Sequence, residues 1–328
     1  MLTIDSPELS RNYGYWNQDE QRALLDSRVA IGGVGGAGFP LGLALARAGV
    51  TEFAVADPDT IAETNFNRHP GAFVDTLGKN KAEVFADMVK RINPDVTVDV
   101  YTEGVNADNV EDFVTGADLV FDGIDFNHPA ESVRLHRQAR AMGRPVLTGL
   151  EIGPSAVVTS FRPDGITFEE AMGYKPNDTL EQIAEKTADG VDLSASVAYL
   201  PYKSTNIKVM EAVQKGAELP TTVFGVDLFG AATGQEAFNH LTAGVAVSPA
   251  PRSLQVARNL LGHVRRGNNR REPVWAPDYL VVDLERMKTK VIRQSRPRFY
   301  MYATLLSVRS KLGLNPDLVY GDDKDADF

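Results

Sequence analysis

The sequence of 328 residues contains no cysteine. Thiolates are the usual ligands of structural zinc and the nucleophiles of thioester and persulfide chemistry. The chain therefore lacks a cysteine zinc site, and it has no sulfur that could carry an acyl group. Its histidines are scattered and lack the spacing of a substitute site, so we expect no zinc. They are His69, His128, His136, His240 and His263.

Long apolar runs and an excess of basic charge are also absent. No stretch approaches 18 apolar residues, so we expect no membrane-spanning helix and no membrane partner. The start, MLTIDS, has neither the basic residues nor the apolar core of a signal peptide. The 34 Lys and Arg against 44 Asp and Glu give a net charge of −10, which argues against nonspecific nucleic-acid binding. We therefore expect a soluble cytoplasmic protein.

The most informative feature present is the glycine-rich stretch GGVGGAG. It separates a short apolar strand, predicted over residues 28–31, from a helix predicted over residues 39–48. Gly33, Gly35 and Gly38 have the spacing G-x-G-x-x-G. Glycine allows a tight turn, and it lets phosphate oxygens approach the unpaired N–H groups at the start of a helix. The stretch predicts a phosphate-binding loop.

A carboxylate follows at the distance that a nucleotide site requires. The second strand is predicted over residues 52–56, and it ends in Asp57. In nucleotide-binding units of this kind, an acid at that place holds a ribose hydroxyl. Glycines alone also occur where helices pack on strands, but glycines combined with Asp57 favour nucleotide binding.

Three hydrogen-bond donors then follow within 17 positions, namely Asn65, Arg68 and Lys81. This is more than ribose recognition needs, and it suits a triphosphate with several negative charges. Asp125 follows another apolar strand, predicted over residues 119–121, at the sheet edge where such folds bind ligands. A carboxylate that faces phosphates is reasonable if Mg²⁺ lies between them. An NAD-dependent oxidoreductase, the alternative from another class, leaves these side chains unexplained.

Taken together, the motifs resemble those of the ThiF/MoeB/HesA adenylating enzymes, which are related to the ubiquitin-activating E1 enzymes. The patterns G-x-G-G-x-G, D-x-D-T, N-x-x-R, G-x-x-K and D-x-x-D occur in this order, and the similarity covers residues 10–165. The resemblance implies a nucleotide loop at Gly33, Gly35, Gly36 and Gly38, a ribose-binding acid at Asp57 with Asp59 in the same motif, phosphate-binding side chains at Asn65, Arg68 and Lys81, and a Mg²⁺ ligand at Asp125.

The same resemblance implies an activity and its partners. ATP and Mg²⁺ would activate a carboxylate as an acyl-adenylate with release of pyrophosphate, and without cysteine no thioester forms on this chain. The carboxylate belongs to a ubiquitin-like carrier protein, a precursor peptide or a small acid, which the nucleotide motifs do not distinguish. A non-catalytic nucleotide-binding scaffold of the same family is the main alternative. One departure is His69, which stands where the family usually has Gln.

A homodimer is also implied, in which Arg11 reaches the phosphates of the neighbouring subunit. Arg11 lies in the family-like segment Ser-Arg-Asn. Residues 1–14 are polar and offer no apolar stripe for docking on their own core. We therefore place Arg11 with Arg68, Lys81 and Asp125 as the catalytic residues.

The predicted fold is α/β, a Rossmann-like doubly wound and mostly parallel sheet with an antiparallel C-terminal extension. We expect one adenylation domain over residues 1–328, in which 10–165 bind the nucleotide, 166–295 form the substrate and dimer half, and 296–328 hold a helix and an acidic tail. Further predicted strands cover 97–101 and 145–150, with irregular connections from 156 and a closing antiparallel pair at 279–284 and 289–292. Predicted helices cover 81–92, 129–142, a glycine-rich 229–241 and an amphipathic 299–312, and a basic loop lies at 265–271.

Overall fold

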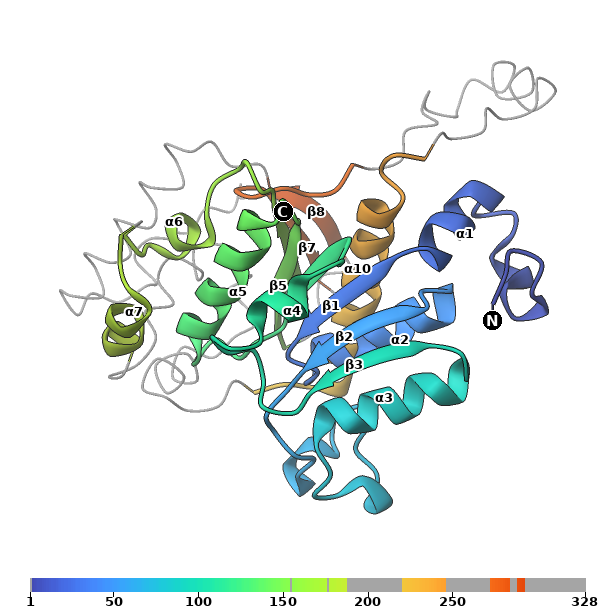
Figure 1. The fold of residues 1–328 in the computed structure, drawn as a ribbon, viewed down its shortest axis with the longest axis horizontal. Coiled ribbons are helices and arrows are strands. Elements are labelled where there is room, and N and C mark those ends of the chain that lie inside the picture. Colours follow the sequence, from blue (N-terminus) through green and yellow to red (C-terminus); the bar gives the residue numbers. More distant parts are fainter. Residues whose placement is uncertain are drawn as a thin grey trace.

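The computed structural model describes residues 2–153, 155–175, 177–187, 220–245, 272–283 and 288–292. Within them the chain forms an eight-stranded sheet of order β3-β2-β1-β4-β5-β6-β7-β8 (Figure 1). The strands are β1 (Arg28–Gly32), β2 (Glu52–Ala56), β3 (Thr97–Tyr101), β4 (Leu119–Asp122), β5 (Val146–Ile152), β6 (Ser155–Phe161), β7 (Tyr279–Asp283) and β8 (Lys288–Ile292).

The sheet changes direction at β5. Strands β3, β2, β1, β4 and β5 pair in parallel, whereas β5 to β8 pair antiparallel. This confirms the predicted mostly parallel sheet with an antiparallel extension. The extension starts earlier than predicted, because β6 lies where irregular connections were expected. All seven residues of β6 are buried, so the strand has no polar alternation that would reveal it in the sequence.

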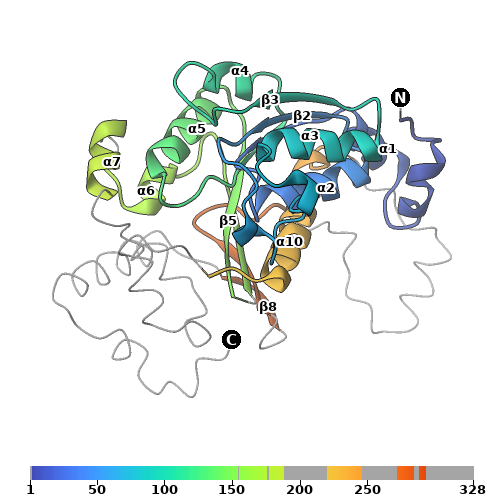
Figure 2. The ribbon, with the colours of Figure 1, turned by 90° about the horizontal axis from the view of Figure 1, so that it is seen from below.

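Helices cover both faces of the sheet (Figure 2). One core contains side chains of α2, α3 and α10, and the other contains side chains of α4 and α5. The predicted helices that fall in the described residues agree closely with the structure, except that α10 begins six residues before the predicted start. The helices are α1 (Gln18–Leu25), α2 (Gly38–Ala48), α3 (Lys81–Ile92), α4 (Val110–Val114), α5 (Pro129–Ala141), α6 (Phe168–Met172), α7 (Leu180–Thr187) and α10 (Val223–Leu241). In the described part of the chain, none is long and apolar enough to cross a bilayer.

The N-terminal segment docks on its own chain, contrary to the prediction from its polar composition. Leu9, in the 3₁₀ helix η1 (Pro7–Asn12), is buried near Gly49 at the end of α2. Trp16 stacks on Phe238 of α10 with 4.7 Å between the ring centres. One apolar residue per turn of a short helix gives too little pattern to predict such docking from sequence.

Several predictions concern residues outside the described ranges. These are the amphipathic helix 299–312, the basic loop 265–271 and the acidic tail 321–328. The C-terminal part of the expected domain division, 296–328, lies there as well.

The glycines of α2 and α10 predict two opposite effects of adding a methyl group. A Cβ on Gly42 would overlap the ring of Phe85, whereas a Cβ on Gly234 would lie 3.6 Å from the Cβ of Ala44, an ordinary contact. Gly42→Ala is expected to lower the free energy of unfolding by about 1–3 kcal/mol through overpacking. Gly234→Ala is expected to raise it by up to about 1 kcal/mol, because alanine favours a helix interior. Urea unfolding of both variants measures this, and equal effects would contradict the packing described.

Candidate functional site

The glycine loop lies between β1 and α2, at the edge where β1, β2 and β4 end together. Gly32 is in register with both Ala56 and Asp122, so the residues after these three strands are neighbours. Gly33 has φ +84°, and its N–H donates to the carbonyl of Ala56 at 2.7 Å. A Cβ on Gly33 would overlap the backbone of Gly123. The first glycine of the motif is therefore required by backbone geometry.

Unused backbone donors gather at the start of α2. Among the described residues, the N–H groups of Gly35, Gly36 and Ala37 donate to no protein acceptor. Ala37, the residue before α2, has no polar side chain that could cap the helix. A helix of 11 residues with free N–H groups at its positive end attracts anions. A Cβ on Gly35 would meet nothing within 4 Å, so the loop is open on this side, as phosphate binding requires.

Two buried side chains hold the loop at Val34. The Val34 N–H donates to Oδ2 of Asp57 at 2.8 Å, and the Val34 carbonyl lies 3.0 Å from Nε2 of His69. The Gly71 N–H donates to Nδ1 of His69 at 3.0 Å, so the ring proton lies on Nε2 and is donated to Val34. We call this arrangement the Val34 clamp. His69 thus has a defined role at the position where it departs from the family pattern.

Burial shifts the pKa values of both side chains of the clamp, His69 and Asp57. Burial lowers the pKa of His69 to about 4, and the charges of Lys81 and Arg68 act in the same direction. His69 is therefore neutral at pH 7, as its hydrogen bonds require. Burial also raises the pKa of Asp57, while Lys81 and the N–H groups of Val34 and Asp59 act against the rise. Asp57 was predicted from its ribose-binding position, and the structure shows that it also supports the loop.

Lys81 is the first residue of α3 and points its ammonium at Asp59. The two groups are 2.7 Å apart, and the side chains are 11% and 66% exposed, respectively. Asn80 positions this lysine, because its Oδ1 caps α3 at the N–H of Ala82 and its Nδ2 donates to the carbonyl of Asp57. Asn80 was absent from the predicted site. Its position immediately before an apolar helix was the available signal.

Asn65 and Arg68 lie in the crossover between β2 and α3. The Oδ1 of Asn65 accepts from the N–H of Ala62 at 3.0 Å. Arg68 donates to the carbonyl of Thr64 and to Oδ1 of Asn67, at 2.9 and 2.8 Å. Both side chains therefore bond within their own turn. Arg68 directly precedes His69 of the Val34 clamp, and its charge acts with burial to lower the pKa of His69.

The two acids of the D-x-x-D motif have different environments. Asp122 is buried and accepts from Ile124 N–H at 3.1 Å and from Ser132 Oγ at 3.2 Å, and it lies 3.1 Å from Nε2 of His136. Asp125 is exposed, and within the described residues its side chain accepts only from the N–H of Asn127, at 2.9 Å. Asp122 therefore shapes the turn that carries Asp125. The sequence alone did not separate these two roles.

Asp125 is suited to bind a Mg²⁺ ion whose remaining ligands are phosphate oxygens and water. Its turn contacts the glycine loop through Gly123 and Gly33. Mg²⁺ in phosphate sites commonly takes one or two carboxylates and completes its shell with phosphate oxygens and water. The described residues contain no group of three or more His, Asp or Glu that holds a metal without such help.

Arg11 lies away from the loop of its own chain. Helix η1 packs at the C-terminal end of α2, where Leu9 contacts Gly49. The glycine loop is at the opposite end of this helix of 11 residues, about 16 Å away. Of the predicted catalytic residues, Arg11 alone is not brought to the edge that carries the loop.

Glu151, near the end of β5, was missed by the sequence analysis. A Cβ on Gly36 would lie 3.2 Å from its Oε1, so the acid borders the loop directly. Burial raises the pKa of Glu151 to about 7, while the charge of Arg68 and a hydrogen bond from Thr221 act against the rise. The signal was an acid at the end of an otherwise apolar strand.

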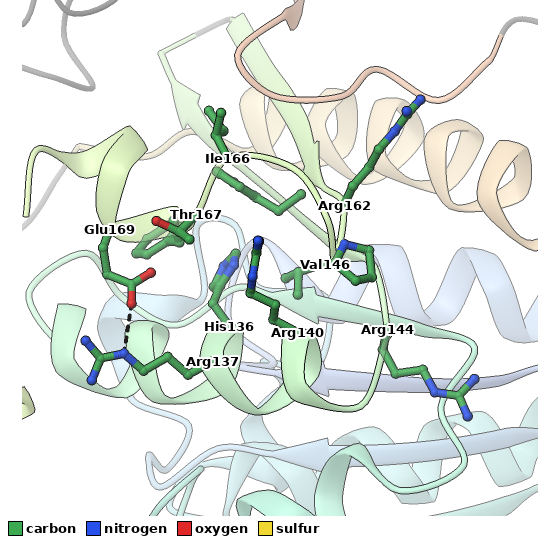
Figure 3. Close-up of a pocket in the computed structure, with 12 residues that line it drawn as sticks. His136, Arg137, Arg140, Arg144, Val146, Arg162, Ile166, Thr167 and Glu169 are labelled. Atoms are coloured by element: carbon green, nitrogen blue, oxygen red, sulfur yellow. Dashed lines mark hydrogen bonds and ion pairs between the residues drawn. The ribbon is translucent and has the colours of Figure 1, made fainter. Parts of the chain in front are cut away.

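A pocket on the α5 side of the sheet contains none of the predicted residues (Figure 3). Its arginines diverge, and each has a partner in the described part of the chain. Arg137 pairs with Glu169 at 2.8 Å, Arg140 donates to the carbonyl of Gly165 at 3.1 Å, Arg144 lies 4.0 Å from Asp118, and Arg162 lies 4.5 Å from the ring centre of Trp275. The arginines that line this pocket are thus engaged by neighbouring groups.

Comparison with known proteins agrees with this geometry. The model of the ThiF family matches residues 9–298. The SAMP-activating enzyme E1 of Haloferax volcanii is 35% identical over 169 residues, which cover 50% of this chain and 62% of that protein. The tRNA threonylcarbamoyladenosine dehydratase of Escherichia coli is 30% identical over 219 residues, which cover 63% of this chain and 80% of that protein.

A solved structure shows the same fold at lower sequence identity. Escherichia coli MccB, crystallised with succinimide, superposes with a TM-score of 0.60 and 18% identity, over 89% of this chain and 73% of that chain. The family match extends over most of the sequence and contains the glycine loop, the Val34 clamp and both acids of the D-x-x-D motif. The chain belongs to the ThiF family.

Proposed function

We propose that this chain is an ATP-dependent adenylyltransferase that activates a carboxylate as an acyl-adenylate. The observation that carries the proposal is the clamped glycine loop, whose free N–H groups face an edge that also holds Arg68, Lys81 and the exposed Asp125. The names of relatives support it, among them a SAMP-activating enzyme E1 and a sulfur carrier protein ThiS adenylyltransferase.

The phosphates of ATP would bind at the loop, with the ribose at Asp57. Lys81 now pairs with Asp59, whose side chain is 66% exposed. Asp59 is the solvent-exposed partner of this pair and Lys81 is nearly buried, so a triphosphate that takes the place of Asp59 would keep the ammonium paired. Among the described residues, Arg68 donates only to Thr64 and Asn67 of its own turn, so its guanidinium can move toward the phosphates beside Asn65. Mg²⁺ at Asp125 would neutralise phosphate charge when bound.

Formation of the acyl-adenylate depends on charged groups held around the phosphates and needs no general base. The substrate carboxylate is already ionised at neutral pH, and it attacks the α-phosphorus while pyrophosphate leaves. Donors fixed in advance around the phosphates stabilise the charge that develops there. Since the chain has no cysteine, the acyl group passes directly from the adenylate to a nucleophile brought by the substrate or a partner.

The substrate and the assembly belong to the same proposal. The carboxylate is that of a ubiquitin-like carrier, a precursor peptide or a small acid, and the active unit is a homodimer. The distance of Arg11 from its own loop supports a shared site. Large exposed apolar side chains around the crossover and the start of α10 supply a surface for either partner, namely Phe66, Phe73, Val74, Leu77 and Phe224. A cytoplasmic location, where ATP is available, completes the proposal.

ATP–pyrophosphate exchange tests the function. A pool of synthetic hexapeptides with free C-termini would be supplied with Mg²⁺, and the same pool with amidated C-termini is the control. Label from pyrophosphate is expected in ATP only with the free acids, together with AMP formation. Release of ADP and phosphate, or ATP binding without exchange for any acid tried, would instead identify an ATPase or a non-catalytic scaffold.

Removing one positively charged side chain from the site is expected to slow adenylation strongly. Arg68→Ala and Lys81→Ala should each lower kcat by roughly 10²-fold, the scale for losing one preorganised charge stabiliser. Lys79→Ala, an exposed neighbour in the same loop, is the matched control and should have no comparable effect. A large fall in melting temperature with unchanged activity would show that these cations act only in stability.

Mixing two inactive variants tests whether Arg11 acts across a dimer. Arg11→Ala and Asp125→Ala are each expected to be inactive. If Arg11 serves the partner's site, a mixed dimer has one site with both defects and one with neither, and partial activity returns. In a preparation shown to exchange subunits, lack of recovery would mean that Arg11 does not act in trans.

A further inference from the structure

Glu151 stands at the point where β5 reaches the glycine loop. Every second residue of β5 faces the same side of the sheet, and on one side these are Leu147, Gly149 and Glu151. Leu147 lies in the core, and a Cβ on Gly149 would lie 2.9 Å from the ring of Phe229. Glu151 is the last of these three positions along β5, and its carboxylate borders Gly36.

One oxygen of this carboxylate lacks a partner. The Oε2 of Glu151 is shielded from solvent and has no hydrogen-bond partner among the described residues. Thr221 donates to the carboxylate, and Arg68 is the charged group that acts on it. A buried acceptor without a donor is costly, so this position favours a ligand that brings one. Once the phosphates have left and the acid is ionised, an amine is the strong donor that this oxygen lacks, whereas a thiol is a weak one.

The other buried acid and the buried base at the loop already use their polar atoms in hydrogen bonds. Both oxygens of Asp57 accept backbone N–H groups, and both ring nitrogens of His69 have partners. Asp59 pairs with Lys81. Asp59 and Asp125 are exposed, so water reaches their oxygens. Among the described buried groups that border the loop, Glu151 is the one with a proton-accepting atom that lacks a partner.

Resting on the proposed function, we infer that Glu151 is the general base of a second step, in which an amine takes the acyl group from the adenylate. The amine nitrogen forms a bond to the acyl carbon, and the bond from this carbon to the AMP oxygen breaks. AMP leaves with that electron pair, and the N–H proton passes to Glu151. The products are an amide, AMP and protonated Glu151, which returns its proton to solvent.

The charge of the bound nucleotide orders the two steps. The phosphates of ATP raise the pKa of Glu151 further, against the opposing charge of Arg68, so the acid is neutral while the substrate carboxylate attacks. Release of pyrophosphate removes most of that negative charge. Glu151 then ionises and accepts a proton when the amine arrives. General bases work best with a pKa near the working pH, which is where burial places this one.

Two amines separate this role from a structural one. Both amines lose one N–H proton as the amide forms, and methylammonium must first release another proton to solvent to give the free amine. Hydroxylamine is largely neutral and reactive enough toward acyl-adenylates to lose its proton to water, so its transfer depends far less on a protein base. With the peptide pool as acid, Glu151→Gln is expected to lower transfer to methylamine by about 10²-fold or more. Exchange with pyrophosphate and transfer to hydroxylamine should change far less. Glu52→Gln, an exposed acid at the start of β2, is the control.

The pH profile supplies an independent readout. For the unchanged chain, methylamine transfer should rise as a group with a pKa near 7 ionises, and this inflection should be missing in Glu151→Gln. If Glu151→Gln keeps pyrophosphate exchange but loses transfer to both amines equally, or loses transfer to neither, Glu151 is not the general base. Absence of exchange in the unchanged chain would instead count against the proposed function itself.

Discussion

The Val34 clamp is the contact on which the site depends. A loop of glycines has many accessible conformations, and fixing it costs conformational entropy. Asp57 accepts from the N–H of Val34 and His69 donates to its carbonyl, so two buried side chains hold the peptide groups on both sides of this residue. The free N–H groups at the start of α2 are thereby held in place before any phosphate arrives. Donors arranged in advance are the main means by which a site with few covalent roles gains rate.

The clamp also connects the parts of the fold. Asp57 follows β2, His69 lies in the crossover, and the loop follows β1, so strand register determines whether the three meet. Asn80 adds α3 to this arrangement through the carbonyl of Asp57. The absence of cysteine then sets the chemistry, because an acyl group formed here has no sulfur on this chain to move to. A base such as Glu151 near the adenylate is a consistent answer to that constraint.

Local patterns predicted most of the nucleotide half. Strands β2 and β3 and helix α3 have the predicted bounds, because each combines a clear apolar pattern with a turn or cap at its ends. The edge that unites Gly33, Asp57 and Asp125 followed from the rule that parallel strands end together.

The features that were missed depend on contacts between distant residues. The bond from His69 to Val34 spans 35 positions, and the pair of Asp122 and His136 spans 14. Strand β6 is buried at every position, so its sequence lacks the alternation of a half-exposed strand. Sequence alone shows which residues are suited to chemistry, but it does not show which of them the fold uses for support.

The most direct test of the central claim is nucleotide binding to clamp variants of His69, since this side chain holds the loop from behind. A non-hydrolysable ATP analogue with Mg²⁺ would be titrated calorimetrically into folded His69→Ala and His69→Gln. The account predicts at least tenfold weaker binding for alanine, about 1.4 kcal/mol, and near-normal binding for glutamine, whose amide can donate to Val34. Folded His69→Ala that binds the analogue with an unchanged Kd would contradict the account.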